Sequence, residues 1–357
     1  MPINLTVILG AGASFDVVNS QSTDLLKDRH GLRFRPPVTA NLFNTHEEWA
    51  DEYKKFPAVA NLVQELRQSL PERHTSVNVE DFLKMLKDSP KIHRNNQFRQ
   101  IPLYLQHYFY NISTNYCKWP ANYLTLINKV FDLDLSKAIF VTTNYDLLFD
   151  QALELSTATN FSIDSTAPNK YVKNNDWAYI KIHGSVDWGR SIKEQMIKNR
   201  GNTLPALRDN VDQWGAQLEE ALEQEINIDK SFINENERKL IYPAISVPIG
   251  ESKLNCWSDH IEILKEHLNQ CQNYLIIGFS GYDRDILHML DEKEGGFGKV
   301  LFVSSSEENA RAAQEKFMIF GELGDKLNGH ADVYPGNGFD EFVRISNGLN
   351  KYLSSLH

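Results

Sequence analysis

Polar residues follow two apolar runs of the chain and could act together on a nucleotide. Asn144 and Asp146 lie just beyond the run 138–141, and His183 follows the run 179–182. An asparagine can hold a ribose hydroxyl or a water through both donors and an acceptor, and an aspartate adds a fixed acceptor. The ordinary pKa of histidine suits a general base near neutral pH. These residues predict a nucleotide site with three reactive side chains beside it.

Each of these residues also has a structural interpretation, which the segments taken singly leave open. Asn144 and Asp146 could form an Asx turn that caps a helix over 147–155. A single histidine at the end of a strand, such as His183, is often a structural residue. Gly184 beside it would leave space for a substrate. The combination of segments favours the functional interpretation.

A turn of small residues follows the apolar run 5–9 and is typical of a phosphate-binding turn. Gly10 can take a positive φ without steric cost, and Gly12 leaves room for a pyrophosphate near backbone N–H groups. A helix beginning here would direct its positive end toward the anion. The turn lacks the full fingerprint of hydride-transfer enzymes and the Lys-Ser or Lys-Thr pair of a Walker-type loop. Tight packing of strand against helix is the alternative explanation.

Apolar runs predict the strands that must position these segments. The expected strands are 5–9, 138–142, 178–182, 240–245, 274–278, 300–304 and 331–334. Helical-looking stretches separate most of them, which favours an α/β fold with a Rossmann-like, doubly wound, mostly parallel sheet. In such a sheet ligands bind at the carboxyl ends of the strands, where the polar segments lie.

The chain is expected to form a single domain over 1–357 with two insertions. The first, about 15–137, is mostly helical in pattern, and the second, about 191–239, is polar and acidic and is expected to form a pair of helices. With 37 Lys and Arg against 47 Asp and Glu, the net charge is −10, which argues against direct binding of nucleic acid. No apolar run approaches the ~20 residues that span a bilayer, so a cytoplasmic protein is expected.

The order of motifs resembles the sirtuin superfamily, and more closely its bacterial defence-associated branch of NAD-consuming enzymes. The motifs are Gly-Ala-Gly-Ala-Ser at 10–14, Pro-Pro-Val-Thr at 36–39, Thr-Thr-Asn-Tyr-Asp at 142–146, Lys-Ile-His-Gly-Ser at 181–185, Ile-Gly-Phe-Ser-Gly-Tyr-Asp at 277–283 and Val303-Ser304. Spread over most of the chain in one order, they make a specific pattern. The resemblance implies the same Rossmann-like fold.

The resemblance also implies roles for individual residues. Asn144 and His183 match the family's catalytic pair, and Asp146 matches a residue near the nicotinamide pocket. The implied NAD⁺-binding residues are Gly10, Ala11, Gly12 and Ser14 at the pyrophosphate, Thr143, Asn144 and Asp146 after the second strand, Gly278 and Ser280 near the ribose or phosphates, and Ser304 at the adenosine half. NAD⁺ is expected as a substrate, with no metal.

One departure from the family shapes the expected function. Sirtuin deacylases carry a zinc ribbon of two cysteine pairs, whereas this chain has three scattered cysteines, Cys117, Cys256 and Cys271. We therefore expect an NAD⁺ glycohydrolase acting in antiphage defence by NAD⁺ depletion (abortive infection). It would be gated by homo-oligomerisation or by a partner, such as an ATPase or a nucleic-acid-sensing protein. The alternatives are an NAD-dependent protein deacylase and a non-catalytic module that senses NAD or ADP-ribose.

Overall fold

The computed structural model divides the chain into two compact units. It describes residues 3–17, 35–43, 54–69, 79–116, 119–133, 135–173, 177–192, 214–229, 241–249 and 254–356. Unit 1 consists of Met1–Pro36, Ile112–Ile182 and Cys256–His357, and unit 2 consists of Pro37–Asn111 and His183–Asn255. The prediction of one catalytic domain with two insertions concerns how these units act together, and it stays a prediction.

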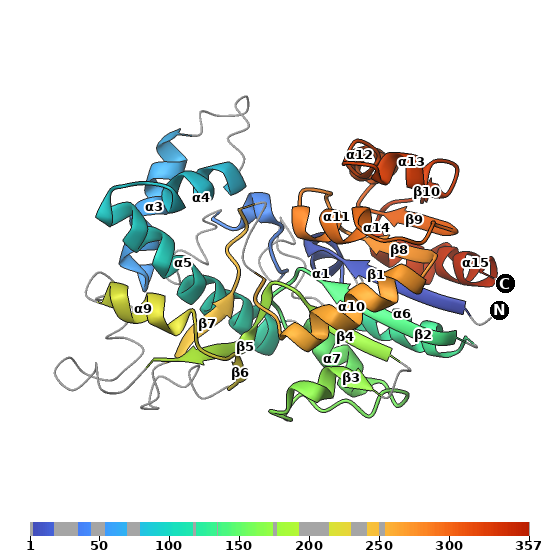
Figure 1. Cartoon of the computed structure of the whole chain (residues 1–357), viewed down its shortest axis with the longest axis horizontal. Coiled ribbons are helices and arrows are strands. Elements are labelled where there is room, and N and C mark those ends of the chain that lie inside the picture. The colour runs from blue at the N-terminus through green and yellow to red at the C-terminus, as the bar shows by residue number, and fades with distance from the viewer. Residues whose placement is uncertain are drawn as a thin grey trace. The chain divides into compact units, whose positions relative to one another are not determined.

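Unit 1 is built on a seven-stranded sheet with the strand order β10-β9-β8-β1-β2-β4-β3 (Figure 1). The strands are β1 (Ile3–Leu9), β2 (Leu135–Thr142), β3 (Val172–Lys173), β4 (Trp177–Lys181), β8 (Asn273–Ile277), β9 (Lys299–Val303) and β10 (Ala331–Val333). Among the described residues, β3 with β4 is the antiparallel pair and the other pairs are parallel. The structure therefore confirms the predicted α/β fold with a mostly parallel sheet.

The register of the sheet aligns the carboxyl ends of its strands. Leu9 pairs with both Thr142 and Ile277, and Thr142 in turn pairs with Lys181. Ile277 pairs with Val303 on the other side. The segments that follow these five residues therefore leave the sheet along one edge, as the sequence predicts. The central strands are mostly apolar because both faces of a parallel sheet are covered.

The helices of unit 1 connect these strands. They are α1 (Ala11–Phe15), α6 (Ala121–Phe131), α7 (Leu148–Leu155), α10 (Ser258–Gln270), α11 (Arg284–Asp291), α12 (Glu307–Met318), α13 (Leu323–Leu327), α14 (Gly338–Asp340) and α15 (Gly348–Ser354), with 3-10 helix Pro168–Tyr171 and π-helical turns at Ile112–Tyr116 and Glu341–Ile345. Side chains cap two of them: Asp283 accepts from the Ile286 N–H at α11, and Ser306 accepts from the Asn309 N–H at α12. Such caps satisfy N–H groups that the first helical turn leaves unpaired.

Unit 2 combines helices with a three-stranded antiparallel sheet of order β6-β5-β7 (Figure 1). Its elements are the 3-10 helix Thr39–Asn41, α3 (Pro57–Ser69), α4 (Val79–Lys87), α5 (Ile92–Asn111), β5 (Gly184–Ser191), α9 (Gly215–Ala221), β6 (Asn227–Ile228) and β7 (Ile241–Ile245). Helix α5 packs on the sheet. Gln106 Nε2 donates to the Val186 carbonyl at 3.2 Å, and the Tyr242 hydroxyl donates to the Arg99 carbonyl at 2.8 Å.

The structure corrects parts of the predicted organisation. The predicted strand 240–245 exists as β7, but it belongs to the antiparallel sheet of unit 2. Strand β5 was not predicted because it contains the polar residues Ser185, Asp187 and Arg190, although all three are buried. Within the acidic insertion, the described residues form helix α9 and the two-residue strand β6, and the rest of the expected pair of helices lies outside the described residues. No helix in the described part of the chain combines the length and apolar character that crossing a bilayer needs.

Candidate functional site

The turn after β1 packs directly against the turn after β8, and the backbones of the two turns are in contact. The Gly10 N–H donates to the Ile277 carbonyl and the Gly12 N–H donates to the Gly278 carbonyl, both at 2.9 Å. A Cβ on Gly10 would lie 2.5 Å from the Gly278 oxygen, and one on Gly12 would lie 2.9 Å from the Gly278 Cα. Side chains at either position would therefore collide with the neighbouring backbone.

This contact between the turns gives a different reason for the glycines from the one predicted. Gly10 has φ −97°, so it does not use the left-handed region, whereas Gly278 has φ +62°. A Cβ on Gly278 would lie 2.0 Å from the Ala13 nitrogen. Since the N–H groups of Gly10 and Gly12 are bonded to carbonyls, a pyrophosphate here would have to use other donors. A side chain at Gly12 would disturb packing as well as any ligand.

Asn144 is held by its side chain against the turn after β1. Its Nδ2 donates to the Gly10 carbonyl and to Ser14 Oγ, each at 2.9 Å, and its backbone N–H donates to Thr142 Oγ1 at 3.0 Å. Both amide hydrogens are thus committed inside the protein. Oδ1, an acceptor, is the amide atom that remains to meet a ligand. Thr143, one residue earlier, is half-buried, and its N–H donates to the Leu9 carbonyl.

Asp146, two residues after Asn144, is 2% exposed. Its Oδ1 accepts from the N–H of Leu148, the first residue of α7, at 3.0 Å, which is the Asx-type contact of the structural interpretation. Burial raises the pKa of the Asp146 carboxyl, opposed by the Ser14 hydroxyl and by Lys181. Oδ2 is buried and has no hydrogen bond in the described part of the chain, although Ser14 lies close enough to lower the pKa.

A buried ion pair supports Asp146 from within the unit. Lys181 Nζ lies 3.0 Å from Asp150 Oδ2, and both side chains are fully buried. The same Nζ donates to the Asp146 carbonyl at 2.8 Å, and the Tyr171 hydroxyl donates to Asp150 Oδ1 at 3.1 Å. A buried pair of charges is stable only when further hydrogen bonds satisfy it, as they do here. The motif containing Lys181 was noticed in the sequence, but its pairing with Asp150 was not.

Tyr123 on α6 is a second residue that sequence reasoning missed. Its hydroxyl lies 2.9 Å from Ser14 Oγ, and the side chain is 1% exposed. Burial raises the pKa of Tyr123 well above its usual value, and the nearby Asp146 adds to the effect. No sequence signal marks Tyr123, because it lies 109 positions from Ser14.

His183 belongs to unit 2, and its main chain is held there. Its carbonyl accepts from the Ser246 N–H at 2.9 Å. Gly184 has φ +88°, and a Cβ there would lie 1.7 Å from the Ala244 oxygen. The glycine is therefore required by its backbone conformation and by the strand pairing, and not only by space for a substrate. His183 is 7% exposed, and its pairing with Asn144 stays a prediction.

A chain of buried polar side chains lies behind Ser246. Ser246 Oγ accepts from Asn255 Nδ2 at 3.0 Å, and Asn255 Oδ1 accepts from Arg190 at 2.6 Å. Arg190 also donates to the Gln224 carbonyl. Burial lowers the pKa of Arg190. These contacts connect the main-chain partner of His183 to β5 and to Gln224 within the acidic insertion.

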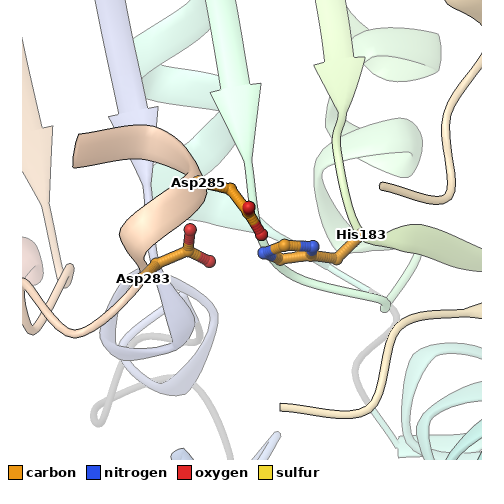
Figure 2. A group of neighbouring side chains, drawn as sticks. All are labelled: His183, Asp283 and Asp285. Atoms are coloured by element: carbon orange, nitrogen blue, oxygen red, sulfur yellow. The ribbon is translucent and has the colours of Figure 1, made fainter. Parts of the chain in front are cut away.

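The remaining predicted residues lie close to the ends of the strands along the same sheet edge. Ala11 is the first residue of α1 and is half-buried. Ser280 is exposed, and its carbonyl accepts from Lys316 at 2.9 Å. The Ser304 carbonyl accepts from the Gly338 N–H at 3.0 Å. Figure 2 shows Asp283 and Asp285 at the start of α11 and His183 in the segment that leads into β5.

One segment of the chain matches a known family model. Residues 138–205 match the model of the SIR2-like domain family. The matched stretch contains most of β2 and all of β4 and β5, together with Asn144, Asp146 and His183. Among curated proteins, no sequence matches the chain.

Solved sirtuin structures are distantly similar. A Sir2 homolog–NAD complex has a TM-score of 0.40 and 13% identity over 98% of this chain and 90% of its own. Sir2Tm bound to a propionylated peptide has a TM-score of 0.38 and 12% identity over 98% of this chain and 94% of its own. SIR2 with the inhibitor EX-527, 2'-O-acetyl-ADP-ribose and a deacetylated p53 peptide has a TM-score of 0.37 and 12% identity over the same shares. None of the residue assignments depends on these structures.

Proposed function

We propose that the protein is an NAD⁺ glycohydrolase that converts NAD⁺ and water to nicotinamide and ADP-ribose. The observation that carries the proposal is the arrangement of Asn144 within the SIR2-like segment 138–205. Its amide is held by Gly10 and Ser14 with one acceptor left for a ligand, and His183 follows in the same segment.

The chemistry requires few protein groups. Nicotinamide is attached to the ribose as a pyridinium, so the bonding electrons leave with its nitrogen and no acid is needed to protonate it. The sugar then develops oxocarbenium character, as in other glycoside cleavages. Water forms the new bond to the anomeric carbon and releases a proton. Catalysis consists of stabilising that cation and positioning the water.

Each predicted residue has a role in this proposal. Asn144 Oδ1 accepts a hydrogen bond from a ribose hydroxyl or from the attacking water. His183 takes the proton that the water loses. Asp146, which is 2% exposed, orients the pocket beside the nicotinamide. Gly10, Ala11, Gly12, Ser14, Thr143, Gly278, Ser280 and Ser304 form the surface along which the dinucleotide binds.

The cysteine count favours water over an acylated lysine as the acceptor. A ribbon of two cysteine pairs requires four cysteines, and this chain has three. In the proposal the protein depletes NAD⁺ in the cytoplasm as an antiphage defence. Because unchecked depletion would kill the cell, oligomerisation or a partner protein, such as an ATPase or a nucleic-acid sensor, holds the activity off until infection.

The test is product analysis of NAD⁺ incubated with the purified protein, with and without an acyl-lysine peptide. We expect nicotinamide and ADP-ribose in equal amounts without the peptide, and no product from Asn144→Ala or His183→Ala. Asn273→Ala and His330→Ala are matched controls, because both residues lie at the opposite end of the sheet strands and bond to main-chain carbonyls there. Both controls should retain activity.

Other outcomes identify the alternatives. Nicotinamide release that strictly requires the peptide would contradict the hydrolase and indicate a deacylase. Binding of NAD⁺ or ADP-ribose in calorimetry without any turnover, in every oligomeric state isolated, would indicate a sensing module.

A further inference from the structure

We propose that Tyr123 is a positioning residue that acts through Ser14 to hold the Asn144 carboxamide with its oxygen toward the ligand. The proposal rests on the proposed function only in treating Asn144 as a residue that contacts the substrate. Its evidence lies entirely within unit 1.

The orientation of the Asn144 amide is determined by its inner partner. The Gly10 carbonyl, 2.9 Å from Nδ2, can only accept a hydrogen bond. A flipped amide would place oxygen against oxygen at this distance and would also exchange the atom that faces Ser14. The amide nitrogen therefore points inward, and Oδ1 is the outer atom.

Counting hydrogen atoms assigns the direction of the next bonds. Ser14 Oγ has two lone pairs and one proton, and one lone pair accepts from Asn144 Nδ2. The Tyr123 hydroxyl lies 2.9 Å from Ser14 Oγ, a distance at which either oxygen can donate, and we assign the tyrosine proton to the second lone pair of Ser14. In this assignment neither Asn144 nor Tyr123 uses the Ser14 proton, and the Ser14 hydroxyl lowers the pKa of the nearby Asp146. Because both lone pairs of Ser14 Oγ then accept hydrogen bonds, the Asn144 atom that faces Ser14 must be the donor Nδ2 and not the acceptor Oδ1.

The tyrosine is itself rigidly placed. Its ring packs edge-on against Phe149, with 5.1 Å between centroids, and tilted against Phe339 at 5.7 Å. The neighbouring Asn122 on α6 donates to the Asp16 carbonyl at 2.7 Å, which connects α6 to the end of α1. The hydroxyl therefore has one available position, and Ser14 is fixed from both sides.

This arrangement restricts what Asn144 can recognise. A ligand group that meets Oδ1 must be a hydrogen-bond donor, such as a water or a sugar hydroxyl. A carbonyl or phosphate oxygen at the same position would face an acceptor. Removing the Tyr123 hydroxyl frees a lone pair on Ser14, so that the contact of Ser14 with Asn144 Nδ2 is no longer fixed and the Gly10 carbonyl alone holds the amide.

The first experiment compares steady-state kinetics of nicotinamide release by Tyr123→Phe, Asn144→Asp and the unchanged protein. For Tyr123→Phe we expect kcat to fall about tenfold with KM changed less than about twofold, because the lost interaction matters in the transition state. Asn144→Asp keeps an outward oxygen but cannot donate to Gly10 or Ser14. We therefore expect it to be as inactive as Asn144→Ala.

Tyr274→Phe is the matched control. Tyr274 is equally buried, and its hydroxyl donates to main-chain carbonyls of Leu268 and Cys271, away from Asn144. Its removal should lower stability and leave kcat unchanged. Equal kcat losses in both tyrosine variants would overturn the positioning role, and so would an active Asn144→Asp.

A second measurement does not depend on turnover. In protein labelled with ¹⁵N-asparagine, the side-chain NH₂ signal of Asn144, assigned by its loss in Asn144→Asp, should exchange slowly with solvent. It should exchange at least about tenfold faster in Tyr123→Phe but not in Tyr274→Phe. If the unchanged protein releases no nicotinamide, the hydrolase proposal fails and this signal alone decides the inference. Unaltered exchange in Tyr123→Phe would overturn it.

Discussion

The two candidate catalytic residues receive their support from different parts of the molecule. Asn144 is fixed through its side chain by Gly10 and Ser14, both in unit 1. The main chain of His183 is fixed by the Ser246 N–H, within unit 2. The acceptor oxygen of Asn144 therefore points in one fixed direction, whereas the position of His183 follows from the pairing of β5 with β7. Because these hydrogen bonds share no residue, variants can disturb them separately, and the predictions below use that separation.

The largest effect is expected from breaking the buried ion pair on the Asn144 side. Lys181→Met leaves Asp150 as an uncompensated buried charge, which should lower the free energy of unfolding by about 3–5 kcal/mol in denaturant titrations. Adding Asp150→Leu to Lys181→Met should recover much of the lost free energy of unfolding. The exposed pair of Arg311 and Glu307 is the control, since Arg311→Met should cost less than about 1 kcal/mol. Similar losses for both single variants would contradict the assigned role.

A pair of glycine variants compares the backbones of the two supports. Gly278→Ala and Gly184→Ala both place a side chain at positive φ and against backbone atoms, so each should cost at least about 2 kcal/mol of unfolding free energy. Only Gly278→Ala should also weaken binding of ADP-ribose in calorimetry, because it separates the turns after β1 and β8. Gly296, with no atom within 4 Å of an added Cβ, is the control and should tolerate alanine. Unchanged affinity in Gly278→Ala would remove that turn from the binding site.

A smaller effect is expected from breaking the hydrogen bonds that connect Ser246, the main-chain partner of His183, to Asn255 and Arg190. Asn255→Ala removes the partner of the buried Arg190 guanidinium and should cost about 1–3 kcal/mol of unfolding free energy. It should also reduce kcat for nicotinamide release while the Asn144 NH₂ signal stays as in the unchanged protein. A changed Asn144 signal would show that the two supports are coupled, which would contradict the separation drawn above.

The smallest effect is a pH dependence on the Asn144 side. Burial raises the pKa of Asp146 above its ordinary value of 3.8, so above that pH the folded state binds more protons than the unfolded state. By linkage, the contribution of Asp146 to stability falls as the pH rises from 3.8 through the folded pKa. Asparagine does not titrate, so the Asp146→Asn variant does not lose this contribution. Its free energy of unfolding should therefore rise relative to that of the unchanged protein as the pH rises. Unfolding curves at several pH values check this, and a constant difference would contradict it.

Much of the fold could be predicted from the sequence because the parallel sheet is buried on both faces. Its strands are therefore continuous apolar runs such as Leu5–Leu9 and Ala138–Thr142, which patterning detects directly. Strand β5 escaped detection because Asp187 and Arg190 interrupt its apolar pattern, although the sheet buries them. Strand β7 was found, but its sheet could not be, since pairing partners are not encoded in a single segment.

The sequence by itself determined which residues leave the carboxyl edge of the sheet: Gly10, Thr143, Asn144, Gly278 and Ser304 all directly follow strands or lie within two residues of their ends. Only the tertiary structure decided how they are used. Asn144 and Ser14 are 130 residues apart, and the glycines are needed where two distant turns cross. Hydrogen-bond direction and backbone clearance depend on atoms that folding brings together, so residue type and spacing alone could not supply them.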